Sequence, residues 1–200
     1  MIAIIDYGMG NLRSVQKAFE RVGAAALVTQ NPDDIAQADQ VVLPGVGAMQ
    51  PAMERLDELG LIPVVRESIS VGKPFLGICL GLQLLFETSS EGGQVQGLGI
   101  LPGTVERFHA LKVPHMGWNQ ISFRDHSPLL AGLKDGSYLY FCHSYFVRPK
   151  DESVICATTD YGIGFVCAIH WNNIFGVQFH PEKSQDLGLG ILKNFTEVRA

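Results

Sequence analysis

The sequence predicts an α/β fold built on a central, mostly parallel β-sheet. In the first half, short and continuously apolar segments alternate with segments whose apolar residues recur at helical spacing. Continuously apolar strands are typical of a parallel sheet that is covered on both faces. After Gly92 and Gly93 the pattern changes to strand-like segments joined by short turns, which predicts antiparallel extensions of the same sheet.

The elements of the first half begin with an apolar strand at residues 2–6, which runs into a glycine loop. Residues 12–22 have apolar side chains at helical spacing, and Asn11 can cap that helix. The remaining elements of this half are two strands, two helices and a fourth strand, at residues 24–29, 40–43, 48–59, 61–71 and 75–78.

The second half is expected to be mostly strands. These lie at residues 97–108, 120–123, 138–147, 154–159, 164–171 and 174–179. Asn172 and Asn173 separate two apolar runs and predict a two-residue hairpin turn. A helix over residues 186–198 closes the chain. Because no linker, repeat or low-complexity segment interrupts the pattern, a single domain over residues 1–200 is expected.

Charge and composition exclude several classes of function. The chain has 15 basic and 20 acidic residues, a net charge of −5, and no basic stripe, so nucleic-acid binding is not expected. No apolar run reaches the length of a membrane span, and the apolar start lacks the basic region of a signal peptide. The four cysteines show no C-x-x-C spacing and the six histidines no zinc-site spacing. We therefore expect a cytoplasmic protein with neither metal nor cofactor.

The segment Gly77-Ile78-Cys79-Leu80-Gly81 is the strongest chemical signal in the sequence. It follows an apolar strand and leads into a helical pattern at residues 82–87, as in the nucleophile elbow, with cysteine as the reactive residue. Glycines remove the Cβ atoms that would clash at so tight a turn, and the helix N-terminus favours the thiolate. Taken alone, the pentapeptide is equally compatible with a buried cysteine between two packing glycines.

A base for this cysteine is available near the end of the chain. The apolar run at residues 175–179 leads into His180, Pro181 and Glu182. A catalytic cysteine needs a histidine to take its proton, and the histidine needs an acceptor that orients it. On an extended segment His180 and Glu182 face the same side, because they are two residues apart. A structural histidine at a strand end is the alternative.

These motifs together resemble the class I, or triad, glutamine amidotransferases. Within that class the chain is most similar to the glutaminase subunits of imidazole glycerol phosphate synthases. The resemblance extends over nearly the whole chain through four further segments, at residues 6–11 (DYGMGN), 44–48 (PGVGA), 114–119 (PHMGWN) and 140–145 (YFCHSY). It implies a flavodoxin-like three-layer fold and a triad of Cys79, His180 and Glu182.

The resemblance also implies how glutamine is bound and activated. The oxyanion formed by thiolate attack is expected to be held by the backbone N–H of Leu80 and by the loop that contains Val46 and Gly47. The expected glutamine-binding residues are Gly45, Gln83, Glu91, Ser144 and Tyr145. The alternatives are an ordinary Pro-Gly turn at residues 44–47 and solvated side chains at Gln83 and Glu91.

A partner is implied because one domain holds no acceptor for ammonia. In the family this partner is a (β/α)₈-barrel cyclase subunit that forms a heterodimer with the glutaminase, and the expected contact residues are Gly8, Met9, Asn11, Trp118, Asn119, Tyr140 and Lys183. The Gly-Trp-Asn segment could equally be a turn with a core tryptophan. No proton transfer is assigned to His115 or His143, and Cys142 is expected to be a packing residue.

Three other functions remain open at this stage. The chain could be the glutaminase of another amidotransferase, such as that of pyridoxal phosphate synthesis, or a stand-alone γ-glutamyl hydrolase. A non-catalytic regulatory protein on the same fold is a third possibility, against which the complete triad argues.

Overall fold

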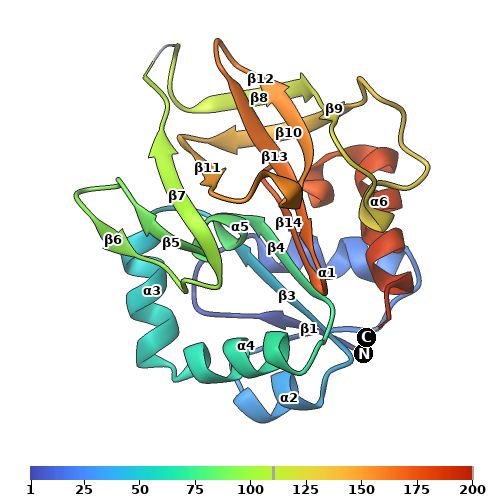
Figure 1. Cartoon of the computed structure of the whole chain (residues 1–200). Coiled ribbons are helices and arrows are strands. Elements are labelled where there is room, and N and C mark those ends of the chain that lie inside the picture. Colours follow the sequence, from blue (N-terminus) through green and yellow to red (C-terminus); the bar gives the residue numbers. More distant parts are fainter. Residues whose placement is uncertain (110, 200) are drawn as a thin grey trace.

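The computed structural model describes residues 1–109 and 111–199, which form one large twisted sheet with helices on both faces (Figure 1). Five parallel strands make up the centre of the sheet in the order β2-β1-β3-β4-β14. Their bounds are β1 Ile2–Ile5, β2 Ala26–Thr29, β3 Gln40–Gly45, β4 Phe75–Cys79 and β14 Ile174–Val177. The expected α/β fold is therefore confirmed.

Alternate residues of the central strands pack into two separate cores. Ile2 and Ile4 of β1 contact one side, where α1 (Leu12–Arg21) and α6 (Gln185–Glu197) lie. Ala3 and Ile5 contact the other side, which is covered by α2 (Pro32–Gln37), α3 (Met49–Glu58) and α4 (Leu61–Ser70). Burial on both faces is why these strands are apolar at every position.

The rest of the chain adds further strands to this sheet, and they pair antiparallel except for β5 and β7, which run parallel. They are β5 Phe86–Ser89, β6 Val95–Gln96, β7 Leu101–Arg107, β9 Ser122–Phe123, β11 Tyr145–Pro149, β12 Ile155–Asp160 and β13 Gly164–Trp171. The path from β14 continues through β13, β11 and β7 to β5 and β6. The expected turn at Asn172 and Asn173 joins β13 to β14, and Asn172 has a φ of 53°.

One prediction about the sheet was wrong: residues 138–147 are two strands and not one. β10 (Tyr138–His143) pairs with β8 (His115–Gln120) in a separate two-stranded sheet, whereas β11 belongs to the large sheet. The break falls at Ser144. A continuous apolar and aromatic pattern cannot reveal such a break, because both halves are strands and only their partners differ.

Other boundaries also differ from the predictions. The helix after Cys79 is the short α5 (Leu80–Leu84), and the residues expected to prolong it form β5. Residues 97–100 precede β7 instead of belonging to it, and the final strand stops at Val177. Helix α2 was not predicted, since Ile35 is its only buried residue. Asn11 precedes α1, but its side chain makes no capping hydrogen bond. Short 3₁₀ turns occur at Pro128–Leu130 (η1), Glu152–Val154 (η2) and Pro181–Lys183 (η3).

Candidate active site

The elbow at the end of β4 has the expected backbone strain. Cys79 has φ 55° and ψ −107°, a left-handed conformation that costs free energy for any residue except glycine. A Cβ on Gly81 would lie 1.7 Å from the carbonyl oxygen of Leu43, and one on Gly77 would lie 2.7 Å from the carbonyl oxygen of Gly81. Both glycines are therefore required for α5 to pass this close to β3 and β4.

His180 and Glu182 form a buried pair beside this cysteine. His180 Nδ1 lies 2.9 Å from Glu182 Oε1, and the two side chains are 3% and 1% exposed. Burial alone would lower the pKa of His180, but hydrogen bonds to Cys79 and Glu182 outweigh it and raise this pKa to about 10. The pair does not lie on an extended segment as predicted. Glu182 lies in the turn η3, which brings its carboxylate back to the ring.

Gln178 is a further polar group at the cysteine, and the sequence analysis missed it. Its Nε2 lies 3.6 Å from Cys79 Sγ, and its Oε1 accepts a 3.0 Å hydrogen bond from Gln83 Nε2. The side chain is fully buried. A signal was available: Gln178 is the one polar side chain in the apolar run 175–179 and stands two residues before His180.

The end of β3 lies directly beside the elbow. Gly45 is the last residue of that strand and is in register with Cys79. Beyond it, Val46 and Gly47 are exposed, and Gly47 has a φ of 95°. Leu80 opens α5 on the other side of the cysteine. The residues expected to stabilise an oxyanion therefore lie directly after the neighbouring strands β3 and β4, next to Cys79.

A cavity of about 460 Å³ opens above the cysteine. Its walls contain the predicted glutamine-binding residues Gln83, Glu91, Ser144 and Tyr145 together with Val46, Gly47, Ala48, Cys79, Leu80, Pro114, Cys142, His143, His180 and Lys183. Gln83 is buried and donates to the carbonyl of Tyr145 at 3.0 Å. One carboxylate oxygen of Glu91 accepts from the backbone N–H of Met49 at 2.8 Å. Gly45, also predicted to bind glutamine, is at the end of β3 and is not among the residues that line the cavity.

The predicted contact residues lie around the same end of the sheet. Gly8, Met9 and Asn11 belong to the loop after β1, while Trp118 of β8 is paired with Tyr140 of β10. Trp118 lies in a strand and not in a turn. Its side chain is 46% exposed and therefore is not part of the core. Lys183 Nζ lies 5.9 Å from the centre of the Tyr140 ring.

Asn119 and Cys142 are two further side chains of this region. The amide of Asn119 is directed inward, where it lies 3.2 Å from His115 Nε2 and donates to the carbonyl of Asp160 at 2.8 Å. Cys142 lines the cavity, and its carbonyl oxygen lies 3.9 Å from Cys79 Sγ. Cys142 therefore forms part of the cavity wall.

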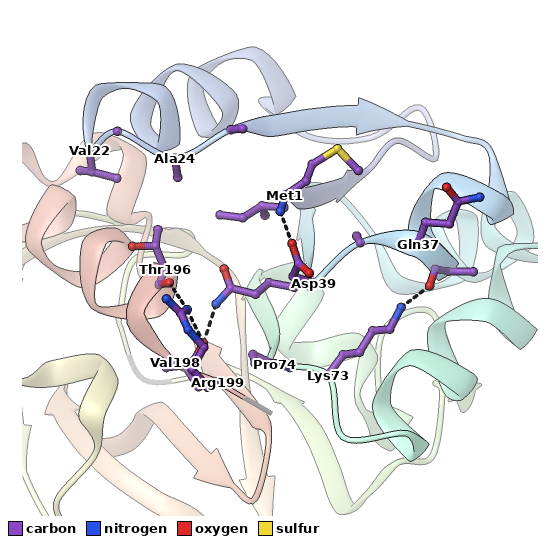
Figure 2. Close-up of a pocket in the computed structure, with 16 residues that line it drawn as sticks. Met1, Val22, Ala24, Gln37, Asp39, Lys73, Pro74, Thr196, Val198 and Arg199 are labelled. Carbon is purple, nitrogen blue, oxygen red and sulfur yellow. Dashed lines mark hydrogen bonds and ion pairs between the residues drawn. The ribbon is translucent and has the colours of Figure 1, made fainter.

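A larger cavity of about 910 Å³ lies at the opposite end of the sheet, next to both chain termini (Figure 2). Its charged groups are largely paired within the chain. The Met1 ammonium forms an ion pair with Asp39, and the Lys73 ammonium donates to the carbonyl of Ala36. Gln40 donates to the carbonyls of Phe195 and Val198. We place the candidate site at the smaller cavity, because the strained cysteine and its histidine are there.

Within residues 1–109 and 111–199, no helix is long and apolar enough to cross a membrane. Nowhere among these residues do three or more histidine, cysteine, aspartate or glutamate side chains gather closely enough to hold a metal ion.

A strained cysteine at a strand-to-helix turn, with a buried His-Glu pair beside it, is the arrangement found in α/β enzymes that use a cysteine nucleophile. The family model described as glutamine amidotransferase class-I matches residues 3–198, so the chain belongs to that family. It is 54% identical over 206 residues to "Imidazole glycerol phosphate synthase subunit HisH" of Syntrophotalea carbinolica, with coverage of 99% of this chain and 100% of the relative. Within the class I amidotransferases, it therefore belongs with the HisH subunits of imidazole glycerol phosphate synthase.

Other relatives and solved structures agree with this placement. Proteins of the same name from Moorella thermoacetica and Aquifex aeolicus are each 56% identical, covering 98% and 96% of this chain and 94% of each relative. A crystal structure titled as a glutamine amidotransferase superposes with a TM-score of 0.77 at 20% identity, covering 98% of this chain and 100% of that one. The structure of PurLQS from Thermotoga maritima superposes with a TM-score of 0.72 at 16% identity, covering 98% of this chain and 95% of that one. At such identities the structures support the fold alone.

Proposed function

We propose that the chain hydrolyses L-glutamine to glutamate and ammonia in the cavity above Cys79 and supplies the ammonia to a cyclase partner. The partner is the (β/α)₈-barrel subunit of an imidazole glycerol phosphate synthase, joined to this chain as a heterodimer in the cytoplasm. It uses the ammonia to form imidazole glycerol phosphate and an aminoimidazole carboxamide ribonucleotide in histidine biosynthesis. Residues 1–200 act as one glutaminase domain and need neither metal nor cofactor.

The observation that carries this proposal is the strained Cys79 next to the buried His180–Glu182 pair. The Cys79 thiolate attacks the side-chain carbonyl carbon of glutamine, and His180 carries the proton that the thiol gives up. When the tetrahedral intermediate collapses, the C–N bond breaks and His180 returns that proton to the leaving ammonia. A γ-glutamyl thioester remains on Cys79. His180, now neutral, takes a proton from water, whose oxygen bonds to the thioester carbon. The C–S bond then breaks, which releases glutamate and the Cys79 sulfur and leaves the proton on His180.

Glu182 holds the ring of His180 in the required tautomer and stabilises its charged form. Its Oε1 accepts the Nδ1–H of His180 at 2.9 Å, which leaves Nε2 for proton transfer at the cysteine. The raised pKa of His180, about 10, keeps its ring protonated at neutral pH before substrate arrives.

The intermediate's oxyanion is stabilised by backbone donors. One is the N–H of Leu80 at the start of α5, and the other comes from the Val46–Gly47 segment after β3. Because Val46 and Gly47 are exposed and follow the last paired residue of β3, their peptides can reorient without breaking the sheet. We propose that this reorientation switches the glutaminase on.

Glutamine is bound by other residues that line the same cavity. Glu91, with one oxygen engaged by Met49, presents its negative charge to the α-ammonium group. Gln83, together with the backbone of Ser144 and Tyr145, forms the wall that receives the rest of the substrate. Gly45 has no side chain, so it allows the backbone at the end of β3 to approach the substrate closely.

The partner covers the exposed side chains around the cavity mouth. Trp118 and Tyr138 are 46% and 53% exposed, and Met116 is 61% exposed. Together with Tyr140, Asn119 and Lys183 and with Gly8, Met9 and Asn11 of the first loop, they form the proposed contact surface. Exposed aromatic and methionine side chains are enriched in protein interfaces.

The experiment that tests this function is glutamate release from glutamine. It is measured for the isolated chain, for the chain with its cyclase subunit, and for the complex with the cyclase's nucleotide ligand. Hydrolysis that appears only in the complex supports the proposal. Fast hydrolysis by the isolated chain, unchanged by either addition, would instead favour a stand-alone hydrolase.

A further inference from the structure

Two buried histidines at the glutamine cavity have no part in the proposed triad: His143 lines the cavity, and His115 contacts His143. His115 and His143 are 3% and 6% exposed, and His115 Nδ1 lies 3.0 Å from His143 Nε2. Aromatic rings surround them: those of Phe108, Phe141, Tyr161 and Phe165. Two histidines in such a site are costly unless their ring nitrogens are fully paired.

The hydrogen bonds around this pair allow only one assignment of donors and acceptors to the ring nitrogens. His143 Nδ1 lies 2.7 Å from the carbonyl oxygen of Tyr145, which can only accept, so Nδ1 carries the hydrogen. In a neutral ring Nε2 then accepts, and its partner 3.0 Å away must be the Nδ1–H of His115. His115 Nε2 in turn accepts from the amide of Asn119, whose orientation is set by its second donation to the carbonyl of Asp160.

The surroundings also keep both rings neutral. The titratable groups that act on His143 are His115 and His180, and protonation of His143 Nε2 would bring two N–H groups face to face. Burial, aided by these neighbours, lowers the pKa of His143 to about 3, and burial lowers that of His115 to about 4. His143 therefore cannot act as a second base beside His180 at neutral pH.

The chain of hydrogen bonds ends at a junction in the cavity wall. The carbonyl of Tyr145 accepts from His143 at 2.7 Å and from Gln83 at 3.0 Å. Gln83 also donates to Gln178, which contacts the sulfur of Cys79. The orientation of one carbonyl is thus determined jointly by the histidine pair and by the side chain that faces the substrate.

We propose that His143 and His115 are positioning residues for glutamine. They fix the carbonyl of Tyr145, and through it Gln83 and the wall formed by residues 144 and 145, in the arrangement that receives the substrate. Asn119 holds the outer end of this series of hydrogen bonds, at His115. The inference rests on the proposed function in one respect, that the cavity above Cys79 binds glutamine.

The tautomers can be tested without any substrate. In ¹⁵N spectra of the imidazole rings of the full chain, both rings should show the Nδ1–H form and should not titrate between about pH 5 and about pH 8. The exposed His126, replaced in His126→Asn, provides a control for assignment. The inference would be overturned if the ring of His115 or His143 were in the Nε2–H form, or if either ring titrated near pH 6.5 like an ordinary histidine.

Kinetics of the complex test the positioning role. His143→Asn keeps a donor at the place of Nδ1, whereas His143→Leu removes it. We expect the glutamine KM to rise about tenfold in His143→Leu, the loss of roughly one well-made hydrogen bond, and to stay within about threefold in His143→Asn. His115→Asn, which keeps the donor to His143, should resemble His143→Asn. His126→Asn should match the parent.

The outcomes separate the two proposals. An unchanged KM in a folded His143→Leu complex, or equal losses in the two His143 variants, would overturn the positioning role. A parent complex that does not hydrolyse glutamine would overturn the proposed function, while the ring spectra would still decide whether the pair is arranged as inferred.

Discussion

At the scale of single residues, the site depends on a cysteine in a strained conformation and a histidine held between that cysteine and a glutamate. Cys79 has a φ of 55°, and His180 lies between Cys79 and Glu182 with a pKa raised to about 10. These two features separate Cys79 from the other cysteines. Burial raises the pKa of Cys156 to about 11 and that of Cys167 well above its usual value, so neither forms a thiolate at neutral pH.

Cys79→Ala should abolish glutamine hydrolysis and leave the fold and partner binding intact. A glutamine analogue with a diazo-ketone should label Cys79 only, as peptide mass spectrometry of the complex can check. Cys142 is the sharpest internal control because it lines the same cavity. Labelling at Cys142, or full activity in the Cys79→Ala complex, would contradict the assignment of the nucleophile.

His180→Asn should cost about as much activity as the loss of Cys79, because members of a triad act as a unit. Glu182→Gln should cost less, since Glu182 orients the ring and transfers no proton. Steady-state glutaminase rates of the complexes check this order. If Glu182→Gln proved the more damaging change, Glu182 would need a different role.

The raised pKa of His180 predicts how its contribution to stability depends on pH. Below about pH 6.5 the ring is protonated in the folded and unfolded states, and the stabilisation is complete. Between pH 6.5 and about 10 only the folded state keeps the proton, so the stabilisation declines and is lost above that range.

The free energy of unfolding, measured in urea from pH 6 to pH 10, should therefore differ less between the parent and His180→Asn as the pH rises. The decline should be smaller in a Cys79→Ala background, because one of the two groups that raise the pKa is missing. A difference that stays constant or grows with pH would contradict this prediction.

At the scale of elements, the site requires that β3, β4 and α5 approach more closely than side chains allow. Gly81 is the tightest point: a Cβ there would meet the Leu43 carbonyl at 1.7 Å, and backbone cannot give way as a flexible side chain can. Gly190 of α6 offers a matched contrast, because a Cβ there meets nothing within 4 Å.

Gly81→Ala should lower the free energy of unfolding by about 3 kcal/mol or more, since overpacking against backbone cannot relax. Gly190→Ala should raise it by about 0.5–1 kcal/mol, through the helix propensity of alanine. Urea unfolding followed by circular dichroism measures both. Equal effects of the two substitutions would mean that the crossing at Gly81 is looser than its contacts indicate.

At the scale of the whole molecule, the cavity mouth and the exposed aromatic face of β8 and β10 form one continuous region. Lys183 lines the cavity and lies over the ring of Tyr140, which is paired with Trp118 (Figure 1 shows the two strands). A partner seated on this face would touch the residue that follows Glu182. Partner binding and hydrolysis can therefore influence each other through very few contacts.

The isolated chain is accordingly expected to be a poor glutaminase that its partner's nucleotide ligand activates. Loss of one oxyanion donor costs about a hundred- to a thousandfold in rate, which is enough for an on–off control by the Val46–Gly47 segment. Glutaminase rates of the chain, the complex and the complex with ligand should rise in that order. Gly47→Ala should reduce the activated rate, because Gly47 has a φ of 95° and a Cβ there would lie 2.9 Å from Met9 Cε. An isolated chain as fast as the liganded complex would contradict the switch.

Features that depend on neighbours along the chain could be predicted from the amino-acid sequence. Uninterrupted apolar strands such as residues 2–5 predicted a sheet covered on both faces, because each strand must bury both of its faces. The spacing of Gly77, Cys79 and Gly81 predicted the elbow, since the steric limits of a tight turn act within five residues. The resemblance to known amidotransferases then supplied the roles of Gln83 and Glu91, which their own surroundings in the sequence did not reveal.

Strand pairings and side-chain contacts between residues far apart in the chain could be seen only in the tertiary structure. The apolar run 138–147 divides at Ser144 because β10 pairs with β8 and β11 with β7. Gln178, the residue after β14, contacts Cys79 although 99 positions separate them, and His143 contacts His115 across 28 positions. Strand propensity is the same whichever strand becomes the partner. The pairings are chosen by long-range packing, and that packing brings buried polar groups together in the hydrogen-bonded network behind the site.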